Sequence, residues 1–145
     1  QVGCFKECGS MTTEVQVRDA LVTYIDAEWK STYPTVKVFY ENTIKINLDS
    51  VGPVFLRVVI EFVDSIRQGI DPSPNTRSYG DILLQVFCKD GQGTRDALAK
   101  IGYLRDLLKY RDVGGATLDC PRVRGTKTSN GWTSQELVVP FTYWQ

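Results

Sequence analysis

Residues 54–62 read VFLRVVIEF, and this stretch decides the fold. Successive side chains of a β-strand point to opposite faces, so alternate positions of the stretch share a face. One face is wholly apolar, and the other is mixed, with Phe55, Arg57, Val59 and Glu61 in a row. This alternation is typical of an antiparallel sheet that packs on one side and is partly wet on the other. The stretch therefore predicts a strand with one face in the core and one toward water.

The flanking sequence predicts further strands and two helices. Residues 80–89 read GDILLQVFCK and repeat the alternation of the first stretch. Apolar positions at helical spacing predict helices over residues 14–31 and 95–110. Thr13 and Gln16 fit a capping box at the start of the first helix. The remaining expected strands cover residues 36–42, 116–123 and 132–144.

The order of these elements predicts an α+β fold. We expect a mostly antiparallel sheet of about four to five strands, with two helices packed on one face. Pro140 lies inside the last expected strand, which favours an edge position or a β-bulge, since proline cannot donate to a ladder. A chain of 145 residues is long enough for one domain. We assign residues 11–145 to that domain.

The composition excludes several classes of protein. Hydrophobic residues make up 42% and charged residues 23%, as in an ordinary soluble globular protein. Lys plus Arg and Asp plus Glu both number 17, so a strongly basic nucleic-acid binder is not indicated. The chain has no histidine, which removes the commonest general base and zinc ligand. No apolar run approaches the ~20 residues of a membrane span, so we expect no membrane partner. The residues predict no catalytic site, no metal site and no cofactor.

Residues 64–79 read DSIRQGIDPSPNTRSY and predict a long loop. Their Asp, Ser, Gly and Pro content favours turns, and a loop of this length exceeds the usual connection. Loops on a rigid scaffold are where binding residues concentrate. The loop's candidate partner contacts are Arg67, Gln68, Arg77 and Tyr79.

Residues 122–131 predict a second, basic loop. Asn130-Gly131 is a strong hairpin-turn signal. No acidic residue lies between Pro121 and Gln135. The three cations of this loop are candidate contacts to a partner's carboxylates or to nucleic-acid phosphates. They are Arg122, Arg124 and Lys127.

The first ten residues, QVGCFKECGS, differ from the rest of the chain. Gly9-Ser10 before Met11 is typical of a cloning junction, so we treat residues 1–10 as an N-terminal extension or a remnant of cloning. Cys4 and Cys8 lie there, and a bridge between them would close a very short loop. Cys88 and Cys120 fall in apolar strand-like runs, which predicts that both are small buried hydrophobes.

From Met11 onward the chain resembles the tail terminator-like proteins of long-tailed bacteriophages. Four blocks carry the resemblance: the stretches VFYEN at 38–42 and FLRV at 55–58, GDILLQVF at 80–87, and VVPF at 138–141. The glycines of Gly91-x-Gly93 and a helix containing Ala97 follow the third block, as in the family. The order and spacing of the blocks carry the match. The loop at 43–53 is longer than is typical of the family.

The resemblance implies a non-enzymatic virion protein. Tail terminators form a ring, usually of six subunits, on the last ring of the tail tube. The ring ends tube polymerisation and provides the surface for head–tail joining. The implied partners are further copies of the chain, the tail tube protein, the head–tail connector protein and, in the lumen, genomic DNA. The implied location is the neck end of the virion tail, reached from the host cytoplasm during assembly.

Three other hypotheses remain open at the level of sequence. The chain could be another head–tail connector or neck protein, because a fold does not determine a function. It could be a small metal-dependent hydrolase built on carboxylates, for which Glu61 and Asp64 are an example of a carboxylate pair. It could also be a host-encoded interaction module unrelated to phages.

Overall fold

The structure, a computed structural model, describes residues 13–40, 52–68, 75–89, 95–129 and 131–144. Several expectations lie outside the described residues. These are the N-terminal segment with Cys4 and Cys8, most of the loop at 43–53, and the glycines at 91 and 93.

Two helices lie on one side of the molecule, as the apolar spacing predicted. α2 (Glu14–Thr32) buries Val17, Leu21, Ile25 and Trp29, and α3 (Arg95–Leu108) buries Ala97, Ile101, Leu104 and Leu108. The expected capping box at Thr13 is confirmed. The Gln16 backbone N–H donates to Thr13 Oγ1 at 3.2 Å, and the Thr13 N–H donates to Gln16 Oε1 at 3.0 Å. These two bonds satisfy donors that a helix start otherwise leaves unpaired.

In the described part of the chain, seven strands form one sheet, more than the four to five expected. The order is β1-β2-β3-β7-β5-β4, and β6 also pairs with β7. Only β1 and β2 run parallel among these strand pairs; the rest are antiparallel. The strands are β1 (Lys37–Tyr40), β2 (Val54–Gln68), β3 (Asn75–Lys89), β4 (Asp112–Val113), β5 (Ala116–Leu118), β6 (Arg122–Ser129) and β7 (Trp132–Trp144).

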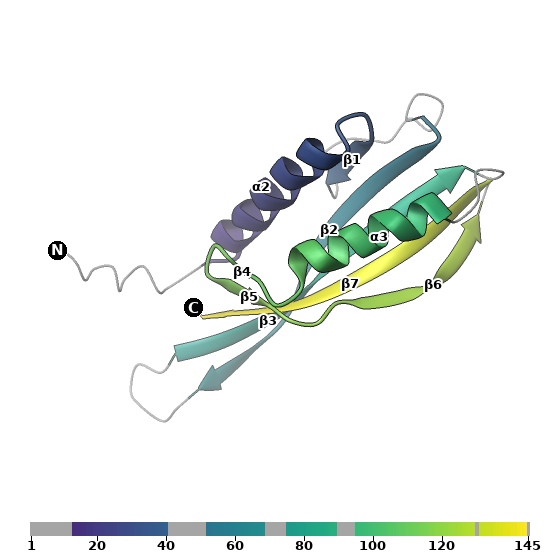
Figure 1. The fold of residues 1–145 in the computed structure, drawn as a ribbon. Coiled ribbons are helices and arrows are strands. Elements are labelled where there is room, and N and C mark those ends of the chain that lie inside the picture. The colour runs from purple at the N-terminus through teal and green to yellow at the C-terminus, as the bar shows by residue number, and fades with distance from the viewer. Residues whose placement is uncertain (1–12, 41–51, 69–74, 90–94, 130, 145) are drawn as a thin grey trace.

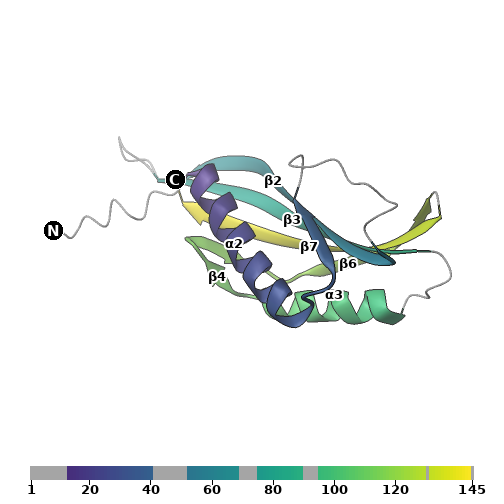
Figure 2. The same cartoon turned by 90° about the horizontal axis from the view of Figure 1, so that it is seen from above.

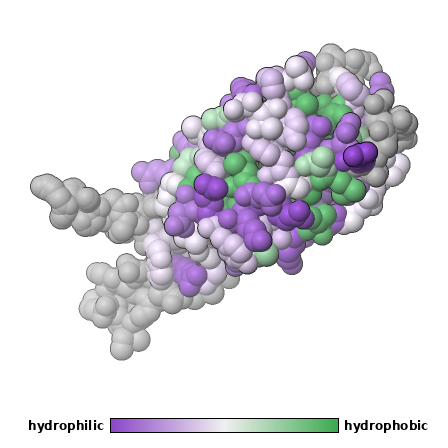
Figure 3. Space-filling model, in the orientation of Figure 1, coloured by the Kyte–Doolittle hydropathy of each residue, from purple (hydrophilic) through white to green (hydrophobic). Residues whose placement is uncertain are grey.

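The main core lies between the helices and one face of the sheet. Leu56, Leu84 and Leu137, from three adjacent strands, are fully buried there with the apolar stripes of α2 and α3. Figures 1 and 2 show both helices on this side, so the predicted α+β architecture is confirmed. The surface on the helix side mixes hydrophilic residues with separate hydrophobic areas (Figure 3). Neither described helix combines the length and apolar character needed to cross a bilayer.

The expected long loop at 64–79 is wrong. β2 continues to Gln68 and β3 begins at Asn75, and the two strands pair antiparallel through Gln68 opposite Asn75. Figure 1 shows these paired ends running beyond both helices. A β-bulge at Val63 interrupts the register between Phe62 and Asp64. The polar residues of this segment can form a β-ladder because the hydrogen bonds of a ladder join backbone groups and do not depend on the side chains.

The expected basic loop at 122–131 is also wrong. Residues 122–129 form β6, which pairs with β7 from Arg122 opposite Val138 to Ser129 opposite Trp132. Only the turn at Gly131, with φ of 82°, keeps the predicted hairpin character among the residues described. The expected strand at 116–123 is correspondingly two strands, β5 and the start of β6.

Pro140 and Cys120 also depart from expectation. Pro140 lies in β7, an interior strand, so the edge position is wrong. Its carbonyl accepts a hydrogen bond from the Asp119 N–H at 2.8 Å, where the chain passes between β5 and β6. The N–H and C=O of one residue point to the same side of a strand. The backbone N–H that proline lacks would therefore face this gap between β5 and β6, where no strand needs it.

Cys120 lies beside the gap between β5 and β6 and is exposed, so the expectation that it is buried is wrong. Cys88 is buried, as expected.

The phenol of Tyr40 connects β1 to α2 by a hydrogen bond. This bond makes the free energy of unfolding fall as the pH rises into the alkaline range. Its hydroxyl donates to Asp26 Oδ1 at 2.9 Å, and burial together with this bond raises the pKa of Tyr40 above its ordinary value near 10. Above about pH 10 the unfolded chain loses this proton before the folded chain does, so stability falls as the pH rises. We expect Tyr40→Phe to cost about 1 kcal/mol at pH 7. We also expect the free energy of unfolding of this variant to decline less steeply above pH 10 than that of the wild type, as measured by urea unfolding across pH 7–11. An alkaline slope identical to that of the wild type would contradict this account.

Candidate functional site

The face of the sheet opposite the helices is the candidate functional surface. We call it the open face. Cross-strand partners project to the same side of a sheet, so the register assigns each residue to a face. Ile60 and Ile82 face the core, and their neighbours Glu61 and Asp81 therefore lie on the open face. No helix among the described residues covers this side.

An aromatic cluster occupies one end of the open face. Phe55 stacks on Phe87 with ring centroids 4.7 Å apart, and it meets Phe39 and Trp132 edge-on at 5.7 and 5.2 Å. Phe55 is 2% exposed and Trp132 is 8% exposed. The expectation of a partly wet face is thus wrong at Phe55, because rings from neighbouring strands cover it. The cluster forms a second, small core on the open face.

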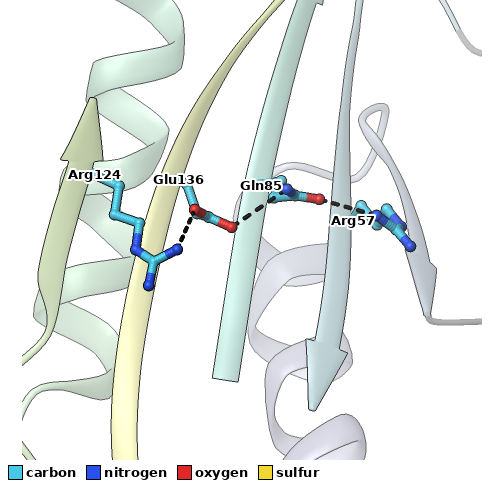
Figure 4. A network of polar contacts seen from close by, with 4 residues as sticks. All are labelled: Arg57, Gln85, Arg124 and Glu136. Atoms are coloured by element: carbon cyan, nitrogen blue, oxygen red, sulfur yellow. Dashed lines mark hydrogen bonds and ion pairs between the residues drawn. The ribbon is translucent and has the colours of Figure 1, made fainter. Parts of the chain in front are cut away.

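A polar ladder crosses four strands beside the aromatic cluster (Figure 4). Arg57 donates to Gln85 Oε1 at 3.2 Å, and the Gln85 amide donates to Glu136 Oε2 at 3.3 Å. Arg124 donates to Glu136 Oε1 at 3.4 Å and forms an ion pair with it. The Glu136 side chain is only 8% exposed, so these bonds satisfy a nearly buried carboxylate.

The three cations expected in the basic loop lie together at one edge of the open face. Arg122, Arg124 and Lys127 are opposite Val138, Glu136 and Ser134, which are alternate residues of β7. The register shift between Arg124 and Lys127 places Lys127 on the same face, despite its odd spacing in sequence. We call these three residues the basic edge. All three are exposed.

An acidic pair lies on the open face on the other side of β7 from the basic edge. Glu61 of β2 and Asp81 of β3 are direct cross-strand partners on the open face. Glu61 is exposed and Asp81 is half-buried. Like charges placed directly opposite each other destabilise a strand pair. Within the described part of the chain, no cation forms an ion pair with either carboxylate.

A groove of about 540 Å³ continues from the acidic pair toward the ends of β3 and β7. Asp81, Arg77 and Tyr79 line it together with Asp119. The Arg77 guanidinium lies 5.6 Å from the Tyr79 ring centroid and 5.8 Å from that of Trp144. Cation–π contacts at these distances hold Arg77 at the far end of the groove. Two of the residues predicted in the long loop thus meet here.

The other two residues predicted in that loop, Arg67 and Gln68, lie in β2, opposite Thr76 and Asn75. They are further along the strand pair than the groove-lining Arg77 and Tyr79. Sequence reasoning missed the acidic pair as a unit, although it placed Glu61 on the mixed face. The missing information was the register, which alone brings Asp81 opposite Glu61.

The described residues contain no group of three or more Cys, Asp or Glu side chains placed to hold a metal ion. Glu61 faces Asp81, and Asp64 follows the bulge in β2.

No protein-family model matches the sequence, and no curated protein matches it. The fold does resemble solved structures. One of them, from a protein whose name carries no functional description, has a TM-score of 0.71 and 16% sequence identity. The match covers 91% of this chain and 96% of the other. At this identity the likeness concerns the fold alone.

Proposed function

We propose that the chain is a subunit of a ring that ends the tail tube of a long-tailed bacteriophage. In this role it is a non-enzymatic structural protein of the virion. The ring, of six subunits as is usual in the family that the chain resembles, stops tube polymerisation and presents a surface to the head connector. Its partners are other copies of the chain, the tail tube protein and the connector protein.

One observation carries the proposal. The described residues of the four sequence blocks that resemble tail terminators fall in β1, β2, β3 and β7, which are consecutive neighbours in the sheet. Blocks that are separated by up to about 50 residues in sequence therefore form one continuous patch of the fold. The convergence supports a shared architecture behind the resemblance.

The arrangement of the sheet suits a ring subunit. β6 bounds the sheet on one side, and β2 beyond Val58 has no β1 residue opposite it on the other. Contacts between different surfaces of identical subunits close into a ring when the rotation permits. The open face lies between these two edges, and the paired ends of β2 and β3 extend past the helices (Figure 1). A subunit built this way has separate surfaces for its two neighbours and for a stacked ring.

The test is deletion of the gene from the phage genome that carries it, followed by electron microscopy of the particles. We expect tails of abnormal length together with DNA-filled heads that lack tails, and restoration by the wild-type gene supplied in trans. Normal-length tails that are unattached to heads would indicate a head–tail joining protein instead. Ordinary infectious virions would contradict both structural roles.

A further inference from the structure

The basic edge is organised to meet carboxylates from outside its own subunit. Arg124 is bound to Glu136, yet its side chain is still 55% exposed. Arg122 and Lys127 are exposed and form no ion pair with another described residue. The β-bulge is what aligns Lys127 with the two arginines on one face. The result is a row of cations along β6, at an edge of the sheet.

The acidic pair is organised to meet cations. Glu61 and Asp81 repel each other as direct cross-strand partners, and no described cation relieves them. Two arginines of β2 and β3 on the same face are already engaged. Arg57 donates to Gln85, and Arg77 lies over the Tyr79 and Trp144 rings. A cation supplied by a second molecule would remove this repulsion.

We infer that the basic edge of one copy of the chain docks on the acidic pair of the next copy. The inference rests on the proposed ring and names the contact that closes it. The basic edge lies on β6 and the acidic pair on β2 and β3, with β7 between them, so the two charged surfaces are separate and the same contact can repeat from subunit to subunit. The acidic surface also carries an exposed apolar neighbour, Val63 at 63%, which lines the groove together with Asp81.

DNA is the other class of partner that a basic strand could bind. The observations favour a second copy of the chain. The open face carries the acidic pair as well as the basic edge, and those carboxylates would repel phosphates. Arg124 already shares its charge with Glu136. The formal net charge of the chain is zero, so no general attraction to a polyanion adds to the contact.

Two charge-reversed variants test the contact. The first is Arg122→Glu with Lys127→Glu, and the second is Glu61→Lys with Asp81→Lys. Sedimentation of the purified full chain at low salt, up to millimolar concentration, measures self-association. We expect the wild type to associate and each variant alone to bind itself about 100-fold more weakly, because like charges then meet at the interface.

The decisive sample is an equal mixture of the two variants. In the mixture every contact again joins opposite charges, provided that the variants alternate, so association should recover to near the wild-type level. Recovery also shows that both variants are folded. The matched control is Arg95→Glu with Arg105→Glu on α3. It makes the same change in net charge on the helix side and should associate like the wild type.

Three results would overturn the contact. They are a wild-type chain that stays monomeric at every concentration, a mixture that does not recover, and loss of association in the α3 control. Binding of labelled double-stranded DNA, measured by anisotropy, distinguishes the alternative. If the β6 variant loses DNA binding but keeps its self-association, the basic edge serves DNA and the inference is wrong. Tail lengths in the deletion phage test the proposed function separately, so the two can fail independently.

Discussion

Replacement of Gly80 with alanine is expected to lower the free energy of unfolding by about 3 kcal/mol, near the upper end for overpacking in a core. Gly80 lies opposite Phe62 on one neighbouring strand and Phe141 on the other. The two rings meet edge-on over it, with centroids 5.8 Å apart. An added Cβ would clash with the Phe141 ring and would lie 2.5 Å from the Glu61 carbonyl oxygen. Backbone on one side and a buried ring on the other leave little room to relax.

Gly102→Ala is the matched control for this prediction. Gly102 lies inside α3, where a Cβ would have only the end of the Arg105 side chain within 4 Å, at 3.7 Å. Alanine there should raise stability by about 0.5–1 kcal/mol, because glycine is a poor helix former. Urea unfolding of both variants measures the difference. A Gly80→Ala protein as stable as the wild type would show that Phe141 does not close over this position.

Truncation of Phe55 to alanine is expected to cost about 4 kcal/mol, although Phe55 lies on the face of the sheet away from the helices. The side chain is 2% exposed and contacts the rings of Phe39, Phe87 and Trp132. Its removal would leave a cavity between three aromatic side chains and would forfeit their edge-on and stacked contacts. Chemical denaturation of the variant measures the loss.

Phe55→Leu is the control for the aromatic cluster. Leucine retains most of the buried apolar surface, so the expected loss is about 1–2 kcal/mol. An alanine variant that loses less than the leucine variant, or no stability at all, would mean that the open face at this position is wet, as the alternation in sequence alone suggested.

The two helices could be predicted from sequence because their positions depend on local spacing. Val17, Leu21, Ile25 and Trp29 recur on one face of a helix, and all four are buried in the core. The capping residues Thr13 and Gln16 lie three positions apart and bond to each other's backbone. The strands around residues 54–62 and 80–89 could be predicted for the same reason, since one face of each is continuously apolar.

The extended ends of β2 and β3 and the whole of β6 could not be predicted in this way. An alternation of apolar and polar residues appears in a sequence only where one face of a strand is buried. The described side chains of β6 from Arg122 to Thr128 are exposed on both faces, so no such alternation marks this strand. These segments are strands because backbone groups pair with a neighbour, whatever the side chains are. Gly, Pro and Asp in residues 64–79 are typical of loops, and for this reason the sequence did not predict the strand pairing of 64–68 with 75–79.

By itself, the sequence determined the α+β class, the helix faces and the alternation that separates a core face from an open face. It also identified Arg122, Arg124 and Lys127 as a group of cations with no acidic residue between Pro121 and Gln135. Only the tertiary structure decided that a register shift aligns these cations on one face, and that Glu61 and Asp81 lie opposite each other. The reason is that faces follow from local spacing, whereas register depends on hydrogen bonds between strands that are distant in the chain.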